Sequence, residues 1–242
     1  MILRTEIIGI GKGSTERSRV ELHVRLYSVN PMSVPFDQSA FRSYITTTFP
    51  DAELNSHPIE FGPVHLRFEL GDEQPNGSDK RIAQSTERAV ALFQEVFSED
   101  DHLVLIIKDW DSSGREMWPS QPPRHLFSLV RDFDNRPSSV EIVRKEKDYS
   151  YFQLFVPAVI RDLDYYNILK GITHREQGRV PRINESVYFV STERSIVFYM
   201  YDDRGCVVYS DISNKLQSLY RKRNDWLVNC YRGLFDQIFC QQ

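Results

Sequence analysis

Several short stretches of the chain alternate between hydrophobic and polar residues, the pattern of a β-strand that buries one face. Residues 20–28 and 64–70 show this pattern most regularly. The run 103–107 is hydrophobic at every position, as expected of a central strand whose two faces are both covered. Residues 140–143 and 151–156 are predicted to form a hairpin.

Other stretches repeat hydrophobic residues at helical spacing. The clearest such helix follows the polar loop 72–79, where Ser78 or Asp79 can cap its first turn. Further helices are predicted over residues 37–48, 124–131, 165–172, 212–222 and 225–239. Asp225 is expected to cap the last of these helices. That helix is expected to bury Leu227, Leu234, Phe235 and Ile238.

The C-terminal quarter holds three hydrophobic runs, 187–190, 196–201 and 206–209, separated by two short polar breaks. This arrangement predicts three consecutive antiparallel strands, followed by two helices. The fold class is therefore α+β, with a mixed or largely antiparallel sheet and helices packed on it.

The domain organisation is predicted as an N-terminal β extension over residues 1–35 and a single α+β domain over residues 36–242. Each half of that domain contains a helix followed by a hydrophobic strand that ends in a pair of aspartates. Two related halves, about 60–135 and 150–242, are therefore an alternative to one undivided unit.

Three segments resemble one bacterial family, called domain of unknown function 3885 and common in Bacillus-like bacteria. They are residues 61–71, the helix 80–97, and residues 187–239 with the elements Tyr201-Asp-Asp-Arg-Gly-Cys206 and Asn224-Asp-Trp226. The resemblance covers roughly residues 38–239, and Val207 departs from it where an acidic residue is usual. The family carries no catalytic assignment, so the resemblance implies no active site. Small bacterial families of this kind often include immunity or other toxin-linked proteins, which makes toxin immunity a candidate function by analogy.

Composition and charge exclude several classes of protein. The net charge of −4 and the pI of about 5.9 do not favour a nucleic-acid or membrane partner. Three cysteines, all late in the chain, do not form a disulfide framework. The N-terminus lacks the features of a secretory signal, and no hydrophobic stretch reaches membrane-spanning length. A soluble, cytoplasmic protein without a cofactor is expected.

Four aspartates at predicted strand ends are the strongest candidates for chemistry. Asp109, Asp111, Asp202 and Asp203 could hold a divalent metal if their strands are neighbours, because carboxylate oxygens are preferred ligands of such ions. The alternative for Asp202-Asp203-Arg204-Gly205 is a structural turn, in which aspartate caps backbone amides and Gly205 adopts a positive φ. The histidines lack zinc-binding spacing, and no G-x-S-x-G motif is present.

The segment from Asp109, Trp110 and Asp111 to Trp118 is the candidate partner-binding surface, because it holds two tryptophans in polar sequence. Packing of both indoles on the sheet is the alternative. A basic cluster at residues 221–223, beside Trp226, is interpreted as a solvated link between two helices rather than a phosphate site. The sequence thus favours a non-enzymatic protein-binding module, such as an immunity protein that neutralises a toxin. The competing hypothesis is a metal-dependent phosphodiesterase or related hydrolase.

Overall fold

The computed structural model describes residues 36–111, 125–136, 139–145 and 149–240, together with two short strands, β1 (Ile7–Ile8) and β2 (His23–Val24). These two strands pair antiparallel, with Ile7 opposite Val24. Most of the predicted N-terminal β extension lies outside the described residues.

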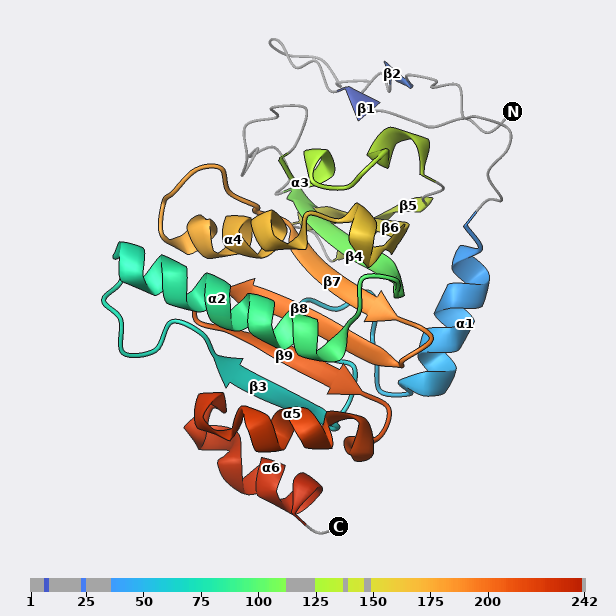
Figure 1. The fold of residues 1–242 in the computed structure, drawn as a ribbon. Coiled ribbons are helices and arrows are strands. Elements are labelled where there is room, and N and C mark those ends of the chain that lie inside the picture. The colour runs from blue at the N-terminus through green and yellow to red at the C-terminus, as the bar shows by residue number, and fades with distance from the viewer. Residues whose placement is uncertain are drawn as a thin grey trace.

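One seven-stranded sheet organises the described part of the chain, in the order β3-β9-β8-β7-β4-β6-β5 (Figure 1). Its strands are β3 (His65–Glu69), β4 (His102–Asp111), β5 (Ser139–Lys145), β6 (Tyr149–Val159), β7 (Ser186–Ser191), β8 (Ile196–Asp202) and β9 (Gly205–Ser210). Every neighbouring pair in this sheet is antiparallel. The fold is therefore α+β with an antiparallel sheet, and both the β5–β6 hairpin and the β7–β8–β9 meander were predicted correctly.

Within the described residues, six α-helices accompany this sheet: α1 (Gln38–Thr48), α2 (Asp79–Val96), α3 (His125–Ser128), α4 (Tyr165–Glu176), α5 (Gln217–Lys222) and α6 (Arg232–Phe239). Short 3-10 turns occupy Phe133–Asn135, Ile160–Asp162, Ser213–Leu216, Asn224–Trp226 and Asn229–Tyr231. The side chain of Ser78 caps α2 by accepting a hydrogen bond from the amide of Arg81 at 3.2 Å. None of the described helices is both long and apolar enough to cross a membrane.

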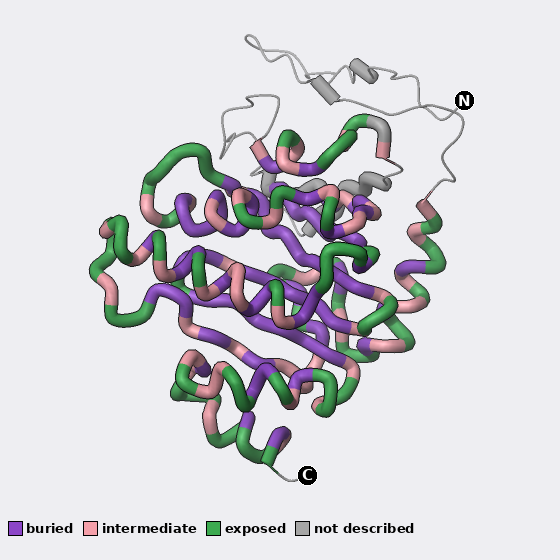
Figure 2. The backbone as a smooth tube through the Cα atoms, viewed as in Figure 1, coloured by how far each residue is buried: buried purple, intermediate pink, exposed green. Residues whose placement is uncertain are grey.

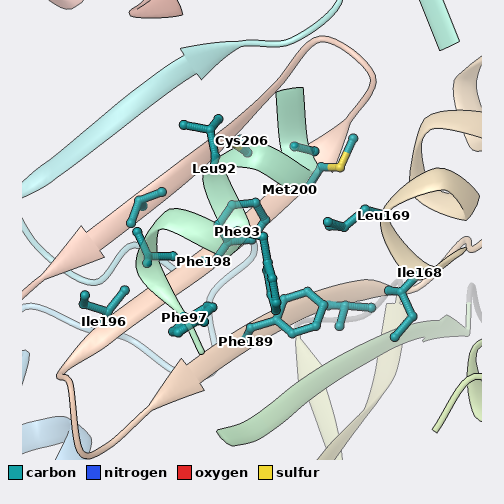
Figure 3. Packing of buried hydrophobic residues seen from close by; sticks show 14 of the residues in the cluster. Leu92, Phe93, Phe97, Ile168, Leu169, Phe189, Ile196, Phe198, Met200 and Cys206 are labelled. Carbon is teal, nitrogen blue, oxygen red and sulfur yellow. The ribbon is translucent and has the colours of Figure 1, made fainter. Parts of the chain in front are cut away.

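Helices α2 and α4 lie across one face of the sheet (Figure 1). Figure 3 shows Phe93 of α2 at the centre of the packing between these helices and the strands. Its ring lies 5.0 Å from that of Phe189 and 5.4 Å from that of Phe198, both edge-on, and stacks on Tyr165 of α4 at 4.8 Å. Leu66 and Phe68 of β3 enter this core at alternate positions, which explains the alternation in the sequence of that strand.

The other face of the sheet is covered in part by α1 and by the segment 49–61. Figure 2 shows the central strands buried along their length. Phe41 and Ile45 of α1, with Phe49 and Phe61, form a second hydrophobic core on this face. Helices α2 and α4 therefore pack on one face of the sheet, and α1 with the segment 49–61 packs on part of the other.

Two buried polar side chains of the sheet hold the segment 49–61 in place. The ammonium of Lys108 is fully buried and donates to the carbonyl oxygens of Leu54, at 2.8 Å, and Ser56. The hydroxyl of Tyr188 accepts from the amide of Ile59 at 3.0 Å. Because a buried ammonium is costly without hydrogen-bond acceptors, Lys108 fixes the path of this segment across the sheet.

The predicted helix 225–239 is wrong over its first half. Leu227 forms a β-bridge with Phe68, and the amide of Val228 donates to the carbonyl of Arg67 at 3.0 Å. These two residues pair with the edge strand β3, so the backbone is extended here and the α-helix starts only at Arg232. The residues of α6 that face the core also differ from those predicted. Phe235 is fully buried, whereas Leu234 is 43% exposed and was wrongly predicted as core.

Replacing Phe235 by Ala should destabilise the fold by about 3–5 kcal/mol, because the ring is fully buried. Replacing the neighbouring Leu234 by Ala should cost about 0.5 kcal/mol or less. Equilibrium unfolding in urea measures both values. Equal losses for the two variants would contradict the observed orientation of α6.

Candidate functional site

A cleft of about 1180 Å³ opens on the face of the sheet that α1 covers only in part. Four arginines and four tyrosines line it, and we call it the Tyr–Arg cleft: Arg67, Arg175, Arg182, Arg204, Tyr199, Tyr201, Tyr209 and Tyr231. His57, Pro58 and Glu60 form one wall, within the segment that Lys108 holds against the sheet.

Strand register brings the floor of the cleft together. Arg67 of β3 lies opposite Val207 of β9, which lies opposite Tyr199 of β8. Two residues earlier in β3, His65 lies opposite Tyr209 of β9. These residues share the face opposite the α2–α4 core, because side chains alternate along each strand. The floor is therefore built on three paired strands and is rigid.

A β-bulge places the central side chain of the cleft. The β8–β9 register shifts between Met200 and Asp202, which leaves Tyr201 as an additional residue in β8. The ring of Tyr201 lies over Gly205 of β9, and its hydroxyl accepts from Nε of Arg67 on β3 at 3.2 Å. The guanidinium of Arg67 also lies 5.0 Å from the centre of the Tyr201 ring and 5.6 Å from that of Tyr231.

Gly205 is needed for this arrangement, but not for the reason predicted from the sequence. Its φ does not lie in the left-handed region, so the expected positive φ is wrong. A Cβ at this position would instead lie 2.5 Å from the carbonyl oxygen of Phe68 and closer still to the hydroxyl of Tyr201. The absent side chain leaves the space through which Tyr201 reaches Arg67.

Arg175 supports the bulge from the helical layer. It comes from the last turn of α4 and donates to the carbonyl of Tyr201 and, at 3.3 Å, to that of Asn184. The carbonyl of Tyr201 belongs to the bulge, where the regular ladder of β-sheet hydrogen bonds is disrupted. Arg175 satisfies that carbonyl and brings a positive charge to the cleft.

The electrostatics of the cleft keep Tyr201 and Tyr209 neutral and Arg67 charged. Burial raises the pKa of Tyr201, an effect that Arg67 partly opposes. Burial, with Glu60 nearby, also raises the pKa of Tyr209. Burial opposes the charge of Arg67, but the hydroxyls of Tyr201 and Tyr231 hold its pKa above the ordinary value. Burial lowers the pKa of His65, so this ring is neutral at pH 7.

Asp202 and Asp203 are each held by an arginine. Asp202 accepts from the amide of Arg204 at 2.8 Å and from its Nε at 2.9 Å, which closes the turn between β8 and β9. Asp203 forms an ion pair with Arg81 of α2, and Arg81 also donates to the carbonyl of Gly71 at 2.7 Å. Both aspartates are buried, and these contacts direct them to different neighbours.

Asp109 and Asp202, which the sequence grouped with Asp111 and Asp203 as a metal site, lie on opposite faces of the sheet. Asp109 is buried in β4, which is separated from β8 by β7. Alternation places Asp109 on the helical face with Ile107, whereas Asp202 lines the cleft on the opposite face. Across the described residues, no three His, Cys, Asp or Glu side chains could jointly hold a metal ion.

The predicted partner-binding segment cannot be placed completely. The backbone of Trp110 and Asp111 continues β4, opposite Tyr151 and Ser150 of β6. The side chains of Trp110 and Asp111, and the whole of Trp118, lie outside the described residues. Their role in binding a partner therefore stays a prediction.

The basic cluster at residues 221–223 partly serves to pack Trp226. The guanidinium of Arg223 lies 4.3 Å from the centre of the indole and that of Arg88 lies 5.2 Å from it. Nε of Arg223 also donates to Glu95 of α2 at 2.7 Å. These contacts tie the C-terminal segment to α2.

The sequence reasoning missed the Tyr–Arg cleft. Its residues come from segments more than a hundred positions apart, and only the strand register brings them together. One signal was available. Two strands carry a polar or aromatic residue at every second position: His65 and Arg67 in β3, and Tyr199 and Tyr201 in β8. In each strand these residues lie on the face opposite the α2–α4 core.

Comparison with known proteins places the chain in a family. The family model described as "Domain of unknown function (DUF3885)" matches residues 41–231. The chain belongs to this family. It is similar to the "Uncharacterized protein YnaE" of Bacillus subtilis (strain 168), with 26% identity over 207 residues that cover 76% of this chain and 95% of that protein. No solved structure matches it.

These findings confirm the resemblance that the sequence carried, and they support a bacterial setting. The matched residues include all of β3, β8 and β9, which form the floor of the cleft. The cleft is thus part of the region that the family model describes.

Replacing Gly205 by Ala should destabilise the fold by roughly 1–3 kcal/mol, because the added Cβ meets the Phe68 carbonyl and displaces Tyr201. Gly233→Ala is the matched control. No atom lies within 4 Å of a Cβ there, and alanine in α6 should raise stability by up to about 1 kcal/mol. Thermal unfolding of both variants tests this contrast, and a tolerated Gly205→Ala would contradict it.

Millimolar Mg²⁺ or Mn²⁺ should leave the melting temperature unchanged, because Asp202 and Asp203 are already paired with arginines. A metal that bound the folded state would raise this temperature by mass action. Differential scanning fluorimetry with and without each ion measures the effect. A rise that Asp203→Ala abolishes would restore the metal-site hypothesis.

Proposed function

We propose that this chain is a non-enzymatic protein-binding module that contacts its partner through the Tyr–Arg cleft. The observation that carries the proposal is the lining of the cleft, four arginines and four tyrosines on a rigid sheet floor. Arginine and tyrosine, with tryptophan, are the residues that most often dominate binding energy at protein interfaces. A preorganised surface also loses little conformational entropy on binding.

The neutralisation of a bacterial toxin is the specific form of binding that we propose to test first. Support for it comes from the bacterial family and from a cleft that could cover a functional surface of another protein. A metal-dependent hydrolase has less support, since the described carboxylates are engaged by arginines or lie on opposite faces of the sheet.

The test uses the product of the neighbouring gene, because immunity genes commonly lie beside those of their toxins. Co-expression with the wild-type chain should relieve any toxicity of that product, and calorimetry should detect a complex. Arg67→Glu with Arg182→Glu should weaken the complex by about thirtyfold or more, because two charges in the cleft are reversed.

The matched control is Lys80→Glu with Arg221→Glu, which makes the same change in net charge on exposed residues outside the cleft. This control should bind as the wild type does. Equal weakening in both double variants would show that the loss of affinity comes from the change in net charge and not from the cleft. Unchanged affinity in the cleft variant would move the interface elsewhere, with the segment 109–118 as the next surface to test.

A further inference from the structure

Two arginines of the Tyr–Arg cleft have no carboxylate partner within the described residues. Arg204 is paired with Asp202, and Nε of Arg175 lies 3.4 Å from the carboxylate of Glu176. Arg67 is held only by tyrosines, and Arg182 is exposed without any ion pair. Glu60 is the one further acidic residue in the cleft lining. The cleft is therefore locally positive, although the whole chain carries a net charge of −4.

Arg67 is preorganised to accept an anion. Its backbone belongs to β3, and its Nε is fixed by the hydroxyl of Tyr201 at 3.2 Å. The hydroxyl of Tyr231 is a second partner of the guanidinium, and the N–H groups of the terminal nitrogens that it does not engage remain for a ligand. A carboxylate fits this edge with two parallel hydrogen bonds, and the surrounding tyrosines provide neutral hydroxyls beside it.

The end of the cleft near α4 holds one unused acceptor. Oδ1 of Asn184 is buried and forms no hydrogen bond, whereas Nε of Arg175 forms no hydrogen bond but lies beside the carboxylate of Glu176 at 3.4 Å. Both residues line the cleft. A peptide backbone supplies an amide donor for Asn184, whereas a fully deprotonated phosphate group supplies acceptors alone. The unused acceptor thus favours a peptide backbone as occupant.

The size of the cleft agrees with this choice. Its volume of about 1180 Å³ lies above the ~300–1,000 Å³ typical of sites for one small molecule. A segment of several residues can occupy it, with backbone groups at Asn184 and acidic side chains at Arg67 and Arg182.

We infer that the occupant of the Tyr–Arg cleft is an acidic, extended segment of the partner protein. The inference rests on the proposed function and adds the chemistry of the partner. It also reverses the expectation from net charge, since a mildly acidic chain would be expected to prefer a basic partner.

Fluorescence anisotropy with defined probes tests the inference directly. The probes are an eight-residue peptide of alternating glutamate and glycine, its counterpart with glutamine in place of glutamate, and, as competitors, ATP and inorganic phosphate. The acidic peptide should bind at least about tenfold more tightly than the neutral one, and its affinity should fall as the salt concentration rises.

Arg67→Gln and Arg182→Gln should each weaken the acidic peptide by about tenfold, the value of one charge-assisted contact. Arg182 is exposed and unpaired, so its variant keeps the fold even if Arg67→Gln does not. Arg221→Gln, an exposed arginine outside the cleft, is the control and should bind as the wild type does.

Several results would overturn the inference. Equal affinity for the acidic and neutral peptides would remove the role of charge. Displacement of the acidic peptide by ATP or phosphate at lower concentration than by unlabelled peptide would identify a small-anion site instead. Absence of acidic-peptide binding at millimolar concentration would reject the inference too. The proposed function is tested by a different result. It is contradicted if the affinity of the partner complex is unchanged in the double variant of Arg67 and Arg182.

Discussion

The central strands of this protein are hydrophobic on both faces, and the rest of the fold follows from that constraint. Helices α2 and α4 lie across one face, and α3 and α5 contribute to the same hydrophobic core (Figure 1). The second face receives α1 and the segment 49–61, which Lys108 and Tyr188 hold in place. Where this cover ends, the strands carry tyrosine and arginine in place of aliphatic residues. The cleft is the part of a two-sided sheet that the chain itself does not cover.

Most of the fold could be predicted from the sequence because the elements are set by local patterns. Alternation identified β3, and three hydrophobic runs with two polar breaks identified the β7–β8–β9 meander. Helical spacing identified α2, for which Ser78 was one of two predicted caps. The error at residues 225–239 has a non-local cause. Leu227 and Val228 pair with the edge of β3, a contact that no helical periodicity can reveal. Tertiary pairing overrode a strong local preference there.

The candidate site was harder to predict than the fold. The pairs of aspartates resembled metal ligands because they follow strands, but the partner of Asp203 is Arg81, 122 positions earlier in the chain. The sequence could not show that contact. Nor could it show that Arg67 and Tyr201 meet, since their contact depends on a bulge and on the order of three strands. The net charge of −4 for the whole chain also gave no indication that four arginines gather in the cleft.

Gly205 shows how a residue outside the lining of a cleft can decide the shape of that cleft. It belongs to the β8–β9 hairpin, yet the space above its Cα is filled by the ring of Tyr201. Any side chain at this position competes with that ring for the same volume. Positions 67, 201 and 205 therefore act as one steric unit that spans three strands. Within the family, a relative with a larger residue at the position of Gly205 must orient its tyrosine differently, and so must present a differently shaped cleft.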